Sequence, residues 1–211
     1  MTIQLDTTAA ISLPEFPETR LLREGDIEKL CNRDSEAIIN QYREREARPG
    51  ETWLTFLPCY KMVSWQHSRA AFISHKANGR SPEFKGAICD RQDLWTYWFH
   101  DFREGCLAIQ RLVTSNRRSD GGSPSEEEQV EALENLLLNG MKEAQSWRLS
   151  KVVVWSPNEQ IESAVCRLRA RLGVKVTTEE LRKDHIPSIR WRGTPPASKV
   201  FVEPNEFYAW S

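Results

Sequence analysis

Residues 85–114, KGAICDRQDLWTYWFHDFREGCLAIQRLVT, decide the fold of this chain. They contain three runs of apolar, aromatic and β-branched residues, which favour strands, at 85–90, 94–101 and 106–114. Short polar segments separate the runs, and Phe102 to Gly105 is typical of the turn between two antiparallel neighbours. This stretch therefore predicts an antiparallel meander of three strands.

Two helical segments precede the meander. Asp26 can cap the first, whose apolar residues recur at the spacing of one buried stripe, although residues 32–35 could interrupt it. The second helix is expected over residues 60–76, before a turn that begins at Asn78. Trp65 and Phe72 are expected to be buried on this second helix.

The chain after the meander alternates between helix and strand. Ser125 and Glu128 have the spacing of a capping box, which predicts a helix that runs to about Trp147. The apolar run at 151–155 is typical of a strand buried on both faces, and Asn158 follows it at the start of another helix. The remaining strand candidates lie at 174–178, 186–192, 200–202 and 207–210.

This order of elements predicts an α/β fold of the mixed α+β kind, with a mixed antiparallel/parallel sheet flanked by helices. No internal repeat or linker divides the chain, so residues 21–211 are expected to form a single domain. Residues 1–20, which include Pro14 and Pro17, are interpreted as an N-terminal arm.

Composition narrows the function classes. The 29 basic and 30 acidic residues nearly cancel, which gives no electrostatic preference for nucleic acid or an anionic membrane. No apolar run approaches the ~20 residues that span a bilayer, and the N-terminus lacks the features of a secretory signal. The five cysteines are dispersed without a C-x-x-C pair, so neither a disulfide framework nor a zinc site is indicated. We therefore expect a cytoplasmic protein with no metal site and no nucleic-acid or membrane partner.

Five short stretches, in this order along the chain, carry a family resemblance. They are WQHSRAAF (65–72), LWTYWFHDF (94–102), IQRLV (109–113), IPSIRWRG (186–193) and NEFYAWS (205–211). They resemble the C-terminal half of the fungal lysine N-acetyltransferase family, within the Gcn5-related acetyltransferase (GNAT) superfamily, over roughly residues 21–211. In that family a catalytic GNAT half comes first and a degenerate GNAT-like half follows. The resemblance implies a GNAT-like domain, a fungal source, and acetyl-CoA or another acyl-CoA as the cofactor.

The resemblance also implies where a cofactor would lie. GNAT enzymes hold the coenzyme A pyrophosphate with a glycine-rich loop at a helix N-terminus, where backbone N–H groups are free. The matching loop here includes Gly121 and Gly122 in a different spacing, Pro124 lacks a donor, and Glu126 to Glu128 compete for the same helix dipole. The tyrosine that protonates the leaving thiolate in many GNAT enzymes has no counterpart after the central strand. The remaining cofactor-binding candidates are Leu112, Val113, Thr114 and Asn158, the last of which could instead be a simple helix N-cap.

His100 is the candidate catalytic residue, as a general base toward an amine, and a partly exposed strand-end histidine is the alternative. Strand alternation places Trp98 and His100 on one face with Arg111. A charged Arg111 inside an apolar strand requires a carboxylate partner or an anionic ligand. Trp65, Arg69, Trp98 and Arg111 are the candidate substrate-pocket residues, although Arg69 could simply stack on Trp65.

These observations leave three functions open. The favoured one is an N-acyltransferase-like protein, degenerate in part, that acts on an amine or a small metabolite. The second is a non-catalytic GNAT-like module that binds a small molecule or a protein. The third is a GNAT-like pocket reused for other chemistry on an apolar metabolite. The expected partners are a small molecule and either a catalytic partner protein or a second copy of the chain.

Overall fold

The computed structural model describes residues 1–5, 19–45, 48–114, 125–178 and 199–203. The described residues form four helices, α1 (Glu24–Glu44), α2 (Tyr60–Asn78), α3 (Glu126–Ser146) and α4 (Glu159–Leu172). The strands are β1 (Thr2–Gln4), β2 (Thr19–Leu22), β3 (Glu51–Leu54), β4 (Gly86–Cys89), β5 (Leu94–Asp101), β6 (Cys106–Leu112), β7 (Lys151–Val154), β8 (Val176–Thr177) and β9 (Lys199–Val202). Two predicted strands, at 186–192 and 207–210, lie outside the described residues, as do two of the motifs, IPSIRWRG and NEFYAWS.

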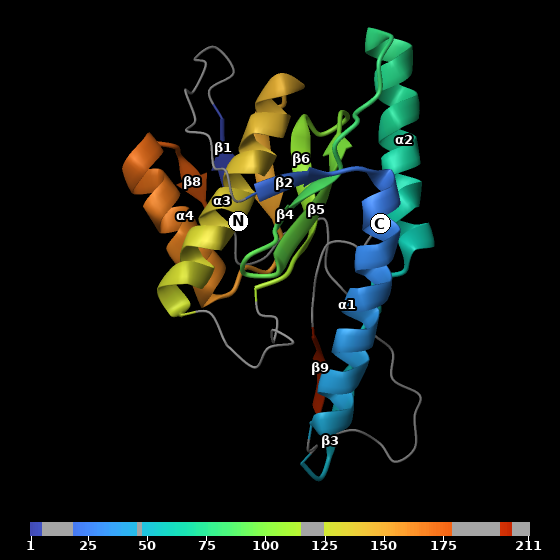
Figure 1. Cartoon of the computed structure of the whole chain (residues 1–211), viewed down its shortest axis with the longest axis vertical. Coiled ribbons are helices and arrows are strands. Elements are labelled where there is room, and N and C mark those ends of the chain that lie inside the picture. Colours follow the sequence, from blue (N-terminus) through green and yellow to red (C-terminus); the bar gives the residue numbers. More distant parts are fainter. Residues whose placement is uncertain (6–18, 46–47, 115–124, 179–198, 204–211) are drawn as a thin grey trace.

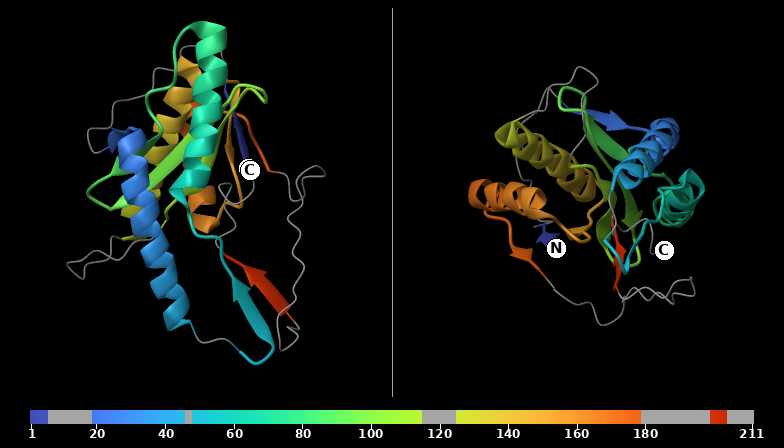
Figure 2. Two further views of the ribbon diagram at one scale, coloured as in Figure 1. Left: turned by 90° about the vertical axis from the view of Figure 1, so that its right-hand side faces the viewer. Right: turned by 90° about the horizontal axis from the view of Figure 1, so that it is seen from below.

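Seven strands form one sheet in the order β2-β4-β5-β6-β7-β1-β8 (Figure 1). As predicted, β4, β5 and β6 pair in antiparallel fashion, and β6 then pairs with β7 in parallel. Helices α1 and α2 cover one face of the sheet, and α3 and α4 cover the other (Figure 2). The predicted α/β class, with a mixed sheet flanked by helices, is confirmed.

The first residues of the chain belong to the sheet. Strand β1 lies between β7 and β8 and is antiparallel to both, and the Met1 amino group donates to the Val154 carbonyl at 2.8 Å. Ile3 is fully buried. Residues 1–5 are therefore an inner part of the fold rather than an arm. A three-residue strand is too short to show a periodicity in the sequence, which is why this part of the prediction is wrong.

Helix α1 begins earlier than expected. Arg23 is the N-cap, and Asp26 lies at the third helical position, where its carboxylate accepts the Arg23 N–H at 2.9 Å. The helix continues through residues 32–35, because the Asp34 side chain pairs with Arg111 on β6 and does not compete for backbone N–H groups of its own helix.

Helix α2 turns a polar face toward the sheet. Gln66, His67 and Ser74 are buried there beside Val63 and Ala70. The prediction that Trp65 and Phe72 are buried is wrong, since these rings are 63% and 66% exposed. Size and hydrophobicity indicated the wrong face, because the polar side chains of α2 have hydrogen-bond partners on α1 and β6.

A β-bulge in β6 reverses one predicted orientation. Tyr97 pairs with Arg111, but the next residue, Trp98, pairs with Ile109, so Gln110 is an extra residue on β6. Arg111 consequently lies on the face of Tyr97, toward α1, and not on the face of Trp98 and His100 as predicted. Strict alternation along a strand fails wherever a bulge adds a residue.

The predicted caps of α3 and α4 are confirmed. Glu128 N–H donates to Ser125 Oγ at 3.2 Å, and Ser125 N–H donates to the Glu128 carboxylate at 2.9 Å, which completes the capping box. Asn158 Oδ1 accepts the Ile161 N–H at 3.0 Å, and α4 ends at Gly173 in the left-handed region, with φ of 67°.

Candidate functional site

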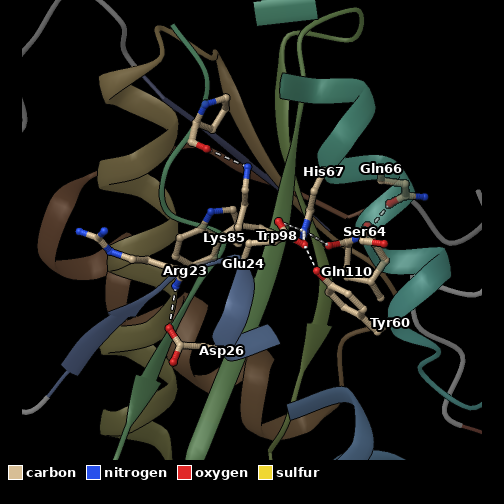
Figure 3. Close-up of polar contacts among 12 residues, drawn as sticks. Arg23, Glu24, Asp26, Tyr60, Ser64, Gln66, His67, Lys85, Trp98 and Gln110 are labelled. Carbon is tan, nitrogen blue, oxygen red and sulfur yellow. Dashed lines mark hydrogen bonds and ion pairs between the residues drawn. The ribbon is translucent and has the colours of Figure 1, made fainter. Parts of the chain in front are cut away.

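A cluster of polar side chains fills the space between the start of α1, helix α2 and β6 (Figure 3). We call it the Glu24 cluster and define it as Glu24, Tyr60, Gln66, His67 and Gln110. His67 Nδ1 lies 2.9 Å from a Glu24 carboxylate oxygen, and the Tyr60 hydroxyl donates to the other oxygen at 2.9 Å. His67 Nε2 lies 2.9 Å from Gln110 Oε1, and the Gln110 amide donates to Gln66 Oε1 at 2.8 Å.

The Gln110 side chain bridges His67 to helix α2. Its amide nitrogen donates to Gln66 Oε1 at 2.8 Å and lies 3.5 Å from the Val63 carbonyl, and its Oε1 faces His67 Nε2. The His67 ring is therefore held between the Glu24 carboxylate and the Gln110 amide.

Burial and charge shift the pKa values of this cluster. Partial burial alone would raise the pKa of Glu24, but the hydrogen bond and charge of His67 and the hydrogen bond from Tyr60 hold it below its ordinary value. Burial, reinforced by the hydrogen bond to the Glu24 carboxylate, raises the pKa of Tyr60 to about 12. Glu24 is therefore an ionised carboxylate at neutral pH. Its side chain is 41% exposed, so it is the part of the cluster that a ligand can reach.

Lys85, immediately before β4, connects this cluster with a second one. Its ammonium donates to the Pro82 carbonyl at 2.8 Å, and its side chain is buried (Figure 3). Burial lowers the pKa of Lys85, while the nearby charges of Glu24 and Glu143 act in the opposite direction. A buried cation between two carboxylates balances the charge of the interior.

His100, the predicted catalytic base, lies in this second cluster and is 1% exposed. Its Nε2 contacts Glu143 Oε1 at 2.8 Å, the Trp147 indole N–H donates to the same oxygen at 2.9 Å, and Phe102 stacks on the ring. Burial lowers the pKa of His100 below its ordinary value, which the hydrogen bond to Glu143 opposes. The alternative, a partly exposed strand-end histidine, is wrong, since His100 is enclosed beneath α3.

The four predicted substrate-pocket residues do not converge. Trp98 is fully buried on the α3 face, where its indole N–H donates to the Phe84 carbonyl. Arg111 forms two hydrogen bonds with Asp34 at 2.8 and 2.9 Å, which is the carboxylate partner that its position required. Trp65 is exposed on the outer side of α2, and Arg69 lies 3.6 Å from Asp101.

The predicted cofactor-binding residues are brought together in part. Leu112 is the last residue of β6 and Val113 follows it, while Asn158 is the N-cap of α4, four positions after the end of β7. The Asn158 amide donates to Thr114 Oγ1 at 3.0 Å, which joins the carboxyl ends of these two parallel strands. The register between β6 and β7 stops at Ile109 and Val154, so β6 continues beyond it without its parallel neighbour, although it still pairs with β5. Gly121 and Gly122 lie outside the described residues.

At the N-terminus of α3, side chains of the chain itself already use two backbone N–H groups. The Glu128 carboxylate already accepts the Ser125 N–H, and Ser125 Oγ occupies the Glu128 N–H. Glu126, Glu127 and Glu128 lie in the first turn, and Arg167 neutralises Glu127 through two hydrogen bonds of 2.8 Å. Side chains of the chain itself thus use two of the N–H groups at this helix end, and three carboxylates compete with a phosphate for the helix dipole.

The described residues contain neither a cluster of metal-ligating side chains nor a membrane-spanning helix. Within them no group of three or more His, Cys, Asp or Glu side chains could hold a metal ion. Across the same ranges no helix is both long and apolar enough to cross a membrane.

The fold defines the class of this protein: an α/β domain of the acyltransferase-like GNAT type. A family model described as the LYC1 GNAT-like C-terminal domain matches residues 3–211, and the chain therefore belongs to this family. The match includes β1 and β2. Searches of curated proteins and of solved structures each found no match.

The sequence interpretation did not single out the residues of the Glu24 cluster as a site. One signal was present: His67 and Gln66 recur with Val63, Ala70 and Ser74 at helical spacing, so that polar residues share the inner stripe of α2. The bulge that orients Gln110 toward His67 left no comparable signal in the sequence.

Proposed function

We propose that the chain is a degenerate N-acyltransferase-like module that acts by binding rather than by acyl transfer. The observation that carries this proposal is the N-terminus of α3, where Ser125 and Glu128 use two backbone N–H groups and the first-turn glutamates compete with an acyl-CoA pyrophosphate for the helix dipole. The enclosure of His100 supports it further, because a general base must come within hydrogen-bond reach of its substrate.

The Glu24 cluster is consistent with a binding role. Glu24 is ionised and partly exposed, whereas His67, which contacts it, and Gln110, which contacts His67, are buried. A carboxylate whose pKa is held low is a weak base but a good partner for an ammonium group. A small amine is therefore the ligand class that this cluster suits.

The test is calorimetry and thermal unfolding with acetyl-CoA and free coenzyme A, alongside release of thiol in the presence of a panel of primary amines. We expect no saturable heat and no shift of the unfolding temperature at about 1 mM cofactor, a concentration that reveals even weak sites. Saturable binding accompanied by thiol release would refute the proposal.

A second candidate, an acyl-CoA-dependent N-acyltransferase, is favoured by one specific observation. The Asn158–Thr114 hydrogen bond joins the ends of β6 and β7, beside the place where β6 continues without its parallel neighbour. If this candidate holds, Asn158→Ala weakens cofactor binding, and Glu24→Gln raises the KM for the amine with little change in cofactor affinity. Neither effect is expected under the binding proposal.

A further inference from the structure

The outward face of α2 carries large apolar side chains that the described chain leaves uncovered. Met62, Trp65 and Phe72 are 41%, 63% and 66% exposed. Their spacing of three and seven residues places them on one side of the helix. Figure 2 (left) shows α2 in the foreground, with this side of the molecule turned toward the viewer.

The apolar exposure is concentrated in this region. Large apolar side chains exposed within the described residues are Phe56, Leu57, Met62, Trp65, Phe72 and Val200, and all but the last lie between residues 56 and 72. Single exposed apolar residues are ordinary on a protein surface, but a group of them along one element indicates an interaction site.

The same face is basic. Lys61, Arg69 and Lys76 are exposed on it, and the sequence of α2, residues 60–78, contains no aspartate or glutamate. The Lys76 ammonium lies 5.9 Å from the centre of the Phe72 ring, and Arg69 is 44% exposed although it pairs with Asp101. Positive charge therefore borders the apolar row and interrupts its middle.

The positions on this face follow the pattern of a helix-packing seam. Residues 62, 65, 69, 72 and 76 are separated by alternating steps of three and four, which is the spacing that lets one helix pack along another. A two-fold pair of α2 helices from two copies would bring Lys61 near Lys76 of the other copy, and this like-charge contact disfavours self-association. Arg69 within the row also fits a lipid surface poorly, since interfacial helices keep their basic residues on the polar face.

We propose that this face of α2 docks an amphipathic helix of another protein whose apolar row is flanked by acidic residues. The inference rests on the binding role proposed above and adds the chemistry of the partner. Trp65 and Phe72 supply the apolar anchors, and Lys61 and Lys76 select acidic flanks through electrostatic complementarity.

The test uses a labelled synthetic helix of about 20 residues, with Leu at the a and d positions and Glu at e and g, titrated with the full chain by fluorescence anisotropy. A second peptide carries Lys in place of every Glu. We expect saturable, salt-sensitive binding of the Glu peptide and no saturable binding of the Lys peptide. The Trp65→Ser/Phe72→Ser variant should weaken it at least about tenfold, which corresponds to 1.4 kcal/mol.

A charge exchange keeps the test informative whatever the apolar variant does. Lys61→Glu/Lys76→Glu should transfer the preference from the Glu peptide to the Lys peptide. Val200→Ser, which removes an exposed apolar side chain from β9, and Lys29→Glu, which reverses an exposed charge on α1, should leave binding unchanged.

Several outcomes would overturn the proposal: no saturable binding of the Glu peptide, equal binding of both peptides, or no response to the charge exchange. Binding to phosphatidylserine-containing vesicles that Trp65→Ser/Phe72→Ser abolishes would assign the face to lipid. Sedimentation that shows a dimer lost in the same variant would assign it to a second copy. These measurements do not involve acetyl-CoA. Failure of the docking proposal is therefore distinguishable from failure of the proposed function, which is tested with acetyl-CoA.

Discussion

The buried ion pair between Arg111 and Asp34 shows that a charged side chain inside the fold needs a partner of opposite charge from another element. Arg111 is 12% exposed and Asp34 3%, and two hydrogen bonds join them across the interface between β6 and α1. The sequence already indicated that Arg111 needs a partner. It could not indicate which residue this is, because Asp34 lies 77 positions away. Only the fold brings the two together.

This pair predicts a characteristic stability pattern. Asp34→Ala leaves a buried guanidinium without its partner and should lower the free energy of unfolding by about 3–5 kcal/mol. The double variant Asp34→Leu/Arg111→Met, which removes both charges, should recover most of that loss. Urea unfolding measures both. A double variant no more stable than Asp34→Ala would show that the packing of these side chains, and not charge burial, dominates.

The lowered pKa values of His100 and Glu24 predict that the folded chain loses stability in two stages as the pH falls. The pKa of His100 is lowered from 6.5, mainly by burial, so the folded chain favours the neutral ring. The stability that this contributes is present above pH 6.5 and is lost as the pH falls toward the folded value. The pKa of Glu24 is lowered from 4.5, so its contribution is present above pH 4.5 and is lost at still lower pH.

Urea unfolding midpoints across a pH series separate the two stages. His100→Gln, whose amide can still donate to Glu143, should flatten the loss between pH 6.5 and 4.5. Glu24→Gln should flatten only the loss below pH 4.5. An unchanged slope above pH 4.5 in His100→Gln would mean that the buried ring is not the group that titrates there.

At the scale of elements, local sequence patterns predicted a helix, strand or cap correctly where the interactions that form it are between residues close in the sequence. The meander, the capping box at Ser125 and the cap at Asn158 all involve residues close in sequence, and the structure agrees with them. The bulge at Gln110 and the inner strand β1 are set by distant neighbours. The Glu24 cluster joins α1, α2 and β6, which are far apart in the sequence, so the polar stripe on α2 was the one local sign of it.

Adding a methyl group at two glycines, Gly86 and Gly140, is expected to change stability in opposite directions. A Cβ on Gly86 in β4 would lie 2.3 Å from the Thr96 carbonyl oxygen, which is backbone and cannot move away. A Cβ on Gly140, inside α3, would meet Leu107 at 3.5 Å and Ile109 at 3.6 Å, which are ordinary contacts.

Gly86→Ala should therefore lower the free energy of unfolding by about 1–3 kcal/mol through overpacking. Gly140→Ala should raise it by about 0.5–1 kcal/mol, because alanine favours a helix over glycine. Thermal or urea unfolding of the two variants provides a matched comparison, since the added atom is the same. Destabilisation by Gly140→Ala would show that the space between α3 and β6 does not accommodate the added methyl group.

At the scale of the whole molecule, the described chain divides into the seven-stranded sheet with its helices and a small two-stranded sheet of β3 and β9. The small sheet lies beside the C-terminal end of α1 (Figure 1). Trp53 stacks on Phe201 at 4.3 Å, Arg45 lies 3.8 Å from the Trp53 ring, and the Tyr42 hydroxyl donates to the carbonyls of Leu54 and Glu203.

Among the described residues few contacts join this small sheet to the rest of the domain, so we expect it to open independently, as a unit of low local stability. Trp53→Ala removes the stacking on both Phe201 and Arg45, and it should raise the amide hydrogen-exchange rates of β9 at least about tenfold, equivalent to 1.4 kcal/mol of opening free energy. The amides of β4, β5 and β6 should keep their protection, because the described ring contacts of Trp53 are with Phe201 and Arg45, outside these strands. Val200→Ala, at an exposed position of the same strand, serves as the control and should have little effect. A uniform rise across both sheets would mean instead that β3 and β9 unfold only together with the whole domain.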